Sequence, residues 1–194
     1  MVGRAREELR PETGNLKPEH DRIWQQARER GLPPNGFLLL VDSTAQKLSL
    51  IRDGRVEETF MVSTSLKGLG NVRDSYMTPT GFHAVVEWIG DGEPAGRVFK
   101  GRKPLDEVIL ETAWANSSAP ERITTRILRL DGLEPGVNRG GDVDTLSRFV
   151  YVHGTNHEDN LGKPASKGCI RVGNLDMIDV FDRTKGAATW CYIG

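Results

Sequence analysis

Residues 36–62 read GFLLLVDSTAQKLSLIRDGRVEETFMV and carry the clearest structural signal in the chain. Phe37–Val41 is a short apolar run of the kind that forms a buried strand. Leu48–Ile51 and Val56–Val62 follow as two further strand candidates. An Asp-Gly pair at 53–54 separates these two, and this pair between strands predicts a tight hairpin. The stretch therefore predicts the beginning of a β-sheet.

The same strand signals continue toward the C-terminus. Five more strands are expected, at residues 82–88, 108–114, 125–130, 149–153 and 189–193. Long loops are expected between them, at residues 65–79, 91–104 and 131–144, and loops of this length are often functional. We therefore predict a mainly β domain.

Two helices are expected at the edges of this sheet. Pro18–Arg30 has a narrow apolar stripe, a first-turn proline and Gly31 as a stop signal. Leu175–Thr184 follows Asn174, which we expect to be its N-cap. The predicted organisation is an N-terminal helical extension and linker at residues 1–35, followed by one domain at residues 36–194.

Composition excludes several classes of protein. The 194 residues include 26 Lys and Arg against 27 Asp and Glu, which gives a net charge of −1. This balance provides no electrostatic footprint for nucleic acid. The mean hydropathy is −0.44, and we expect no transmembrane segment because no run of about 18 apolar residues occurs. The N-terminus has no apolar stretch, so no signal peptide is visible.

The chain has two cysteines, Cys169 and Cys191. Two are too few for a disulfide scaffold, and neither lies in a C-x-x-C motif. Their number alone leaves three alternatives open: one disulfide, two buried thiols, or one reactive thiol with a bystander.

The motifs YVHGTN at 151–156 and GKPASKGCIRV at 162–172 carry the chemistry. The first ends a predicted strand with His153, and the second places Cys169 sixteen residues later. A thiol becomes a nucleophile on deprotonation, and we expect His153 or Arg171 to lower its pKa. Gly168 lets a carbonyl oxygen approach the Gly168 and Cys169 amides, which is the geometry of an oxyanion hole.

Other interpretations of these residues are weaker. A lone cysteine in a β protein is more often a small buried hydrophobe, but the neighbouring His-Gly-Thr motif favours a nucleophile. His153, His157 and Asp159 suggest a metal site, yet Gly154 indicates a loop rather than the helix that would align them. We therefore expect no metal site, and we interpret His157 as exposed.

Side chains outside these motifs are interpreted as structural. We expect His83 to be half-buried, and Trp88 and Trp114 to be core residues on strands. Arg97, Lys100, Arg102 and Lys103 form a basic cluster in a mixed-charge loop, whose default interpretation is a solvated loop and whose alternative is a substrate lid.

The two motifs resemble the signature of the L,D-transpeptidases with a YkuD-type catalytic domain. That signature has a His-Gly on a strand, then Ser-His-Gly-Cys followed by any residue and Arg or Asn. The resemblance extends to VSTS at 62–65, TPTGF at 78–82 and NLD at 174–176, and so covers residues 37–194. It implies a β-sandwich of that family's type with peripheral helices.

The resemblance implies the catalytic roles. Cys169 would be the nucleophile, and His153 the general base and later the acid. The Gly154 carbonyl would orient His153, and the amides of Gly168 and Cys169 would form the oxyanion hole.

Three more residues are implied in substrate binding. Ser166 would hydrogen-bond within the active loop, and Arg171 would hold that loop or bind an anionic substrate group. Lys167 stands where the family usually has His, which keeps a donor at the mouth of the site but removes a titrating imidazole.

The implied reaction is acyl transfer on peptidoglycan stem peptides, and it needs no metal or organic cofactor. A stem peptide would be the donor and an amine the acceptor, forming 3→3 cross-links or attaching another amine, and a carbapenem would form an adduct on Cys169. Alternatives are an L,D-carboxypeptidase or related hydrolase, a non-catalytic wall-binding domain, and a cytoplasmic thiol enzyme. Because peptidoglycan lies outside the cytoplasmic membrane, we expect the periplasm or cell wall, with a leader removed from this sequence.

Overall fold

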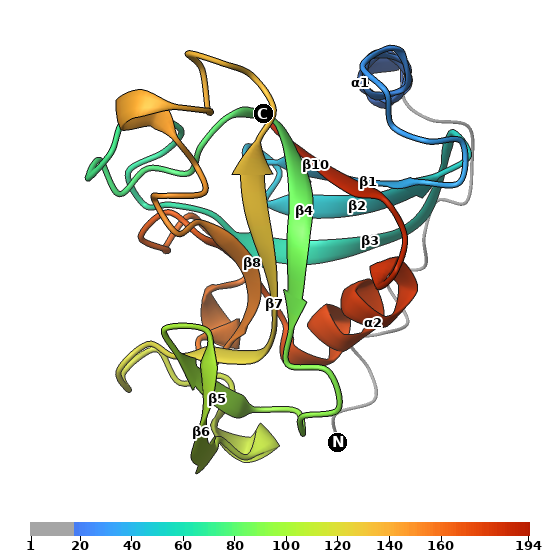
Figure 1. The fold of residues 1–194 in the computed structure, drawn as a ribbon. Coiled ribbons are helices and arrows are strands. Elements are labelled where there is room, and N and C mark those ends of the chain that lie inside the picture. The colour runs from blue at the N-terminus through green and yellow to red at the C-terminus, as the bar shows by residue number, and fades with distance from the viewer. Residues whose placement is uncertain (1–17) are drawn as a thin grey trace.

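Ten strands form one continuous sheet in the computed structural model, which describes residues 18–194 (Figure 1). The strands are β1 (Phe37–Asp42), β2 (Lys47–Arg52), β3 (Arg55–Ser63), β4 (Gly81–Ile89), β5 (Arg97–Lys100), β6 (Lys103–Val108), β7 (Ile123–Gly132), β8 (Tyr151–Thr155), β9 (Ile170–Val172) and β10 (Thr189–Ile193). The helices are α1 (Pro18–Glu29) and α2 (Asn174–Thr184), with short 3-10 turns η1 (Glu111–Ala113), η2 (Gly141–Val143) and η3 (Glu158–Asn160). The predicted mainly β fold is confirmed.

The sheet curls until its two halves face each other. Its strand order is β4-β10-β1-β2-β3-β9-β8-β7-β5-β6, and β4 also pairs with β7. This extra pairing closes the first eight strands into a ring and leaves the β5–β6 hairpin outside it. β1, β2 and β3 cross the direction of β4 and β7, and α2 fills one end of the space between the halves (Figure 1).

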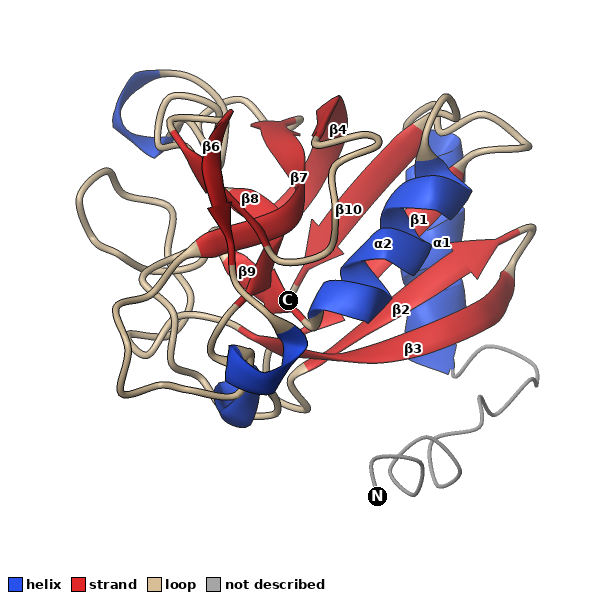
Figure 2. Cartoon of the chain, turned by 90° about the horizontal axis from the view of Figure 1, so that it is seen from below, coloured by secondary structure: helices blue, strands red, loops and turns tan. Residues whose placement is uncertain are grey.

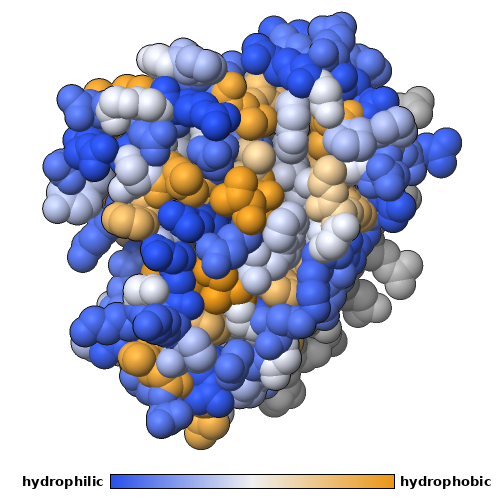
Figure 3. All heavy atoms as spheres, viewed as in Figure 1, coloured by the Kyte–Doolittle hydropathy of each residue, from blue (hydrophilic) through white to orange (hydrophobic). Residues whose placement is uncertain are grey.

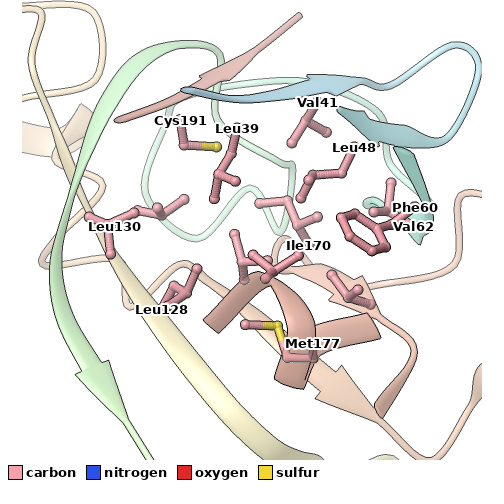
Figure 4. Packing of buried hydrophobic residues seen from close by; sticks show 14 of the residues in the cluster. Leu39, Val41, Leu48, Phe60, Val62, Leu128, Leu130, Ile170, Met177 and Cys191 are labelled. Atoms are coloured by element: carbon pink, nitrogen blue, oxygen red, sulfur yellow. The ribbon is translucent and has the colours of Figure 1, made fainter. Parts of the chain in front are cut away.

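Strand β1 is apolar from Phe37 to Val41 because both of its faces are covered. Alternating side chains of a strand point to opposite faces, so Leu39 packs with Met177 of α2 in the main core (Figure 4). Leu38 points the other way and packs with Ile23 and Trp24 of α1. The two helices therefore lie on opposite faces of this part of the sheet (Figure 2).

The second cysteine belongs to the core. Both Cys169 and Cys191 are free thiols, and Cys191 is fully buried beside Leu39 (Figure 4). Burial raises the pKa of the Cys191 thiol to about 12. The interpretation of Cys191 as a packing residue is confirmed.

The predicted strand at 108–114 is wrong. Strand β6 ends at Val108, and the 3-10 turn η1 follows. The apolar residues of this segment were misleading because Trp114 is buried from a loop, where its indole Nε1 donates to the Ile109 carbonyl at 2.8 Å. Part of the expected loop at 91–104 is instead the hairpin β5–β6.

The predicted N-cap of the second helix is also wrong. Gly173 is the N-cap of α2, and Asn174 is the first helical residue. The Asn174 side chain turns into the protein, where its Nδ2 donates to the Thr155 carbonyl and to Glu158 Oε1, each at 2.7 Å. Tertiary hydrogen bonds thus replace the local bond that an N-cap would make.

The face of the molecule shown in Figure 3 is mostly polar. Hydrophilic side chains cover most of the face shown in Figure 3, and apolar side chains gather near its middle. Neither helix of residues 18–194 combines the length and apolar character needed to cross a membrane.

Candidate active site

The parallel pairing of β8 with β9 brings the two sequence motifs together. His153 of β8 is the register partner of Arg171 of β9, and Cys169 directly precedes β9. Register partners place their side chains on the same face of a sheet. A pocket of about 480 Å³ opens here, lined by Pro120, Glu121, Ile123, His153, Lys167 and Cys169. Three residues singled out from the sequence, His153, Lys167 and Cys169, therefore share one pocket.

His153 is buried and oriented by the backbone of its own strand. Its ring Nδ1 lies 2.7 Å from the Gly154 carbonyl oxygen, which can only accept, so Nδ1 carries the proton. Nε2 is then the unprotonated nitrogen of the neutral ring. Burial lowers the pKa of His153, outweighing the Gly154 carbonyl, which raises it. The ring is thus held as a neutral base.

Arg171 acts on the Cys169 pKa in the expected downward direction, but the net shift is upward. Removal of solvent around the half-buried thiol raises its pKa to about 11, although Arg171 and the Tyr151 N–H act in the opposite direction. The Sγ atom lies 3.7 Å from the Phe149 carbonyl oxygen, to which the thiol donates. The resting site therefore pairs a neutral thiol with a neutral imidazole, because desolvation opposes both charged forms.

Ser166 ties the active loop together. Its hydroxyl donates to the Cys169 carbonyl at 2.6 Å, and its oxygen accepts the Gly168 N–H at 3.2 Å. The Gly168 amide, one of the two predicted oxyanion-hole donors, is therefore bound to Ser166 in this structure. Gly168 has φ +124°, a conformation that favours glycine, and its α-carbon faces the Met77 carbonyl.

Arg171 is buried rather than open to substrate. Its side chain is 3% exposed, and its Nη2 lies 2.5 Å from Glu121 Oε1. Of the two roles expected for Arg171, this position favours holding the loop over binding an anionic substrate group. Lys167 is exposed at the mouth of the pocket.

Two histidines that do not line the pocket are more buried than predicted. His157 is buried, not exposed, and its Nε2 lies 2.8 Å from the Ala119 carbonyl oxygen. His83 is fully buried rather than half-buried, with its Nε2 3.1 Å from Thr145 Oγ1, and burial lowers its pKa to about 4. Both rings are used as local hydrogen-bonding groups inside the fold.

A buried polar network behind Gly154 was not predicted from the sequence. The hydroxyls of Thr124 and Thr125 both donate to Asn174 Oδ1. Thr125 has φ +68° at an irregularity of the β7–β8 pairing, an unusual conformation for a β-branched residue. Such strain persists only where surrounding contacts impose it and is typical of functional sites. In the sequence, this network is marked only by two adjacent threonines, and such a pair does not by itself predict a polar network.

The structural role of Arg148 was also not predicted from the sequence. Its guanidinium donates to the Asn71 carbonyl at 2.9 Å and to the Met77 carbonyl at 2.7 Å. It thereby fastens the loop before β4 to the turn that precedes β8. An arginine between a predicted loop and a predicted strand has no sequence pattern that reveals such contacts.

Replacing Gly154 with alanine should disturb the histidine. An added Cβ would lie 2.7 Å from the Thr124 carbonyl oxygen and 2.9 Å from Asn174 Oδ1. The backbone must shift to relieve this overlap, which should cost about 1–3 kcal/mol of unfolding free energy and displace the carbonyl that orients His153. Urea unfolding and the rate of Cys169 acylation by imipenem both check this.

Gly173→Ala is the matched control. Its Cβ would lie 3.3 Å from the flexible Asp176 carboxylate, so we expect a loss below about 1 kcal/mol and an unchanged acylation rate. Equal effects of the two substitutions on acylation would contradict a special role for Gly154.

The fold and the motif together define a YkuD-type domain. Residues 36–193 match the YkuD L,D-transpeptidase catalytic domain, and the chain belongs to this family. Cysteine-dependent acyl transfer is general for the family, whose members act on peptidoglycan.

The chain is also similar to individual proteins. The chain is 26% identical over 159 residues to YqjB of Bacillus subtilis (strain 168), whose name describes it as an L,D-transpeptidase. The match spans 82% of this chain and 71% of YqjB. A match of 45% identity over 47 residues to YkuD of the same organism spans 24% of this chain and 29% of YkuD. A crystal structure of the L,D-transpeptidase from Xylanimonas cellulosilytica DSM 15894 shares 21% identity, with a TM-score of 0.49, and the alignment covers 88% of this chain and 68% of that one.

Proposed function

We propose that this protein is an L,D-transpeptidase that transfers acyl groups between peptidoglycan stem peptides through Cys169. One observation carries the proposal: the Cys169 thiol shares a pocket with His153, whose ring is fixed by the Gly154 carbonyl with Nε2 unprotonated. A nucleophile, a base and a group that orients the base are the components of nucleophilic acyl transfer.

The first stage acylates the cysteine. Because the pKa of Cys169 is raised to about 11, little thiolate is present at neutral pH, so proton transfer to His153 Nε2 must accompany attack. The sulfur attacks the carbonyl carbon of the L-to-D peptide bond of a tetrapeptide stem. The carbon–nitrogen bond then breaks, and His153 returns the proton to the departing amine of the terminal D-residue.

The Cys169 N–H is the donor best placed for the oxyanion of this step. The Gly168 N–H is bound to Ser166 Oγ at 3.2 Å, a length at the weak end of the range for hydrogen bonds. Substrate binding would have to release it before both amides could act together. Ser166 therefore acts as the group that orders the loop in the absence of substrate.

The second stage passes the acyl group to an acceptor. An amine of another stem attacks the thioester, which forms a 3→3 cross-link and regenerates the thiol. Such a substrate places the working protein in the periplasm or cell wall.

Purified tetrapeptide muropeptides provide the test. The wild-type chain should release the terminal D-residue and form 3→3 cross-linked dimers, detected by mass spectrometry. Tripeptide stems without dimers would identify an L,D-carboxypeptidase instead. Bound but unaltered muropeptides, together with no imipenem adduct on Cys169, would identify a non-catalytic wall-binding domain and overturn the proposal.

A further inference from the structure

We propose that Glu121 binds the ammonium group of the acceptor, so that the pocket favours an amine over water in the second stage. This inference rests on the proposed acyl transfer and adds a specificity-determining residue to it. Glu121 provides the only carboxylate among the residues that line the pocket of His153 and Cys169.

The contacts of Glu121 fix one of its oxygens and leave the other available. Oε1 lies 2.5 Å from Arg171 Nη2, while Oε2 accepts no hydrogen bond from residues 18–194. The Glu121 side chain is 27% exposed, so it reaches the pocket without being fully solvated. An oxygen of this kind is suited to a charge-assisted hydrogen bond from a ligand.

Arg171 makes the position of this carboxylate rigid. Its Nε and Nη1 atoms are buried without hydrogen-bond partners among residues 18–194, so Glu121 is its counterion. Removing a buried guanidinium from its only counterion is costly, which keeps Glu121 in place. The Arg171 backbone is in turn fixed by the pairing of β9 with β8.

Glu121 lies close enough to His153 and Cys169 to act on both electrostatically, since the three residues line one pocket. Its charge acts to raise both pKa values, although burial outweighs it at His153. A cation bound to Glu121 would therefore lie close to the thioester. Lys167 is the basic side chain that lines the pocket, and it repels a cation. An ammonium is therefore directed to the Glu121 side of the pocket.

An amine acceptor arrives mainly as an ammonium, since amino groups of peptides and lysine have pKa values of about 8 and above. The bound ammonium loses one proton to solvent at the open mouth. The free amine then attacks the thioester carbon, the carbon–nitrogen bond forms and the carbon–sulfur bond breaks, and His153 passes the second amine proton to the sulfur. Water can donate a hydrogen bond to Glu121 but carries no charge, so it forms no ion pair there.

Two small acceptors test this inference on the stem-acylated enzyme. Glycinamide is largely cationic at neutral pH, and hydroxylamine is largely neutral. In Glu121→Gln, the KM for glycinamide should rise about fivefold to tenfold, while the KM for hydroxylamine should change less than twofold. Glutamine retains an oxygen for Arg171, so the substitution mainly removes the charge.

Glu57→Gln is the matched control. Glu57 is also paired with an arginine, with its Oε2 2.6 Å from Arg183 Nη2, but it does not line the pocket. Its substitution should leave both KM values unchanged. A second measurement needs no variant: added salt should raise the wild-type KM for glycinamide and not that for hydroxylamine.

The outcomes separate this inference from the proposed function. Failure of the wild type to form a thioester on Cys169 would overturn the proposed function itself. Normal acylation with equal changes for both acceptors, in the variant or with salt, would overturn only the role of Glu121. If Glu121→Gln does not fold, the salt measurement on the wild type decides.

Discussion

Replacing Cys169 with alanine should abolish formation of the acyl-enzyme. Wild-type protein incubated with imipenem should gain the mass of one adduct, located on the peptide that contains Cys169. The variant should gain none, and its release of the terminal D-residue from tetrapeptide stems should fall by about 10⁴-fold or more. The reason is that no other thiol is available: Cys191, the second cysteine of the chain, is fully buried in the core.

Cys191→Ala is the natural control for this experiment. Cys191 packs beside Leu39 and lines no part of the pocket, so its variant should keep the adduct and the turnover. An adduct on Cys169→Ala, or equal turnover of stems by the variant and the wild type, would contradict the nucleophile assignment.

Replacing His153 with alanine should slow acylation by about 10²–10⁴-fold, the usual contribution of a general base. The thiol of Cys169 has a pKa raised to about 11, so it depends on a neighbouring base at neutral pH. The rate of adduct formation with imipenem, followed by mass spectrometry, measures the loss. A loss of less than tenfold would show that the thiol does not need the imidazole.

The pH dependence of the wild type tests the same base. Burial lowers the pKa of His153 from 6.5, so the neutral base persists as pH falls, and acylation should decline only below pH 6.5. No second limb should appear near neutrality, because the Cys169 thiol does not ionise there. A bell-shaped profile centred near neutrality would indicate a preformed thiolate–imidazolium pair instead.

Acid unfolding must be distinguished from this titration. The buried rings of His83 and His153 have lowered pKa values in the folded chain. Such groups favour the unfolded state as pH falls below about 6.5, because the unfolded chain takes up protons first. Circular dichroism at each pH should therefore accompany the rate measurement, and a loss of rate is assigned to His153 only where the protein remains folded.

Much of the fold was predictable because its signals are short-range. The hairpin at 53–54 and the strands beside it follow from turn residues and apolar runs. The strand expected at 108–114 was wrong because its apolar residues do not share one buried face: Trp114 is buried from a loop, whereas Val108 and Leu110 are exposed. The prediction of Asn174 as the N-cap was wrong because its side chain hydrogen-bonds to the distant Thr155 carbonyl instead of to the backbone of its own helix.

The sequence by itself determined that the chain has a β fold, and which two residues are candidates for nucleophile and base. These properties follow from local residue order: apolar runs, turn residues, and His-Gly and Gly-Cys motifs. Only the tertiary structure decided the pocket carboxylate, the burial of Arg171 and the direction of the Cys169 pKa shift. Those properties depend on solvent exclusion and on charges brought together from distant segments, and both exist only once the sheet has closed.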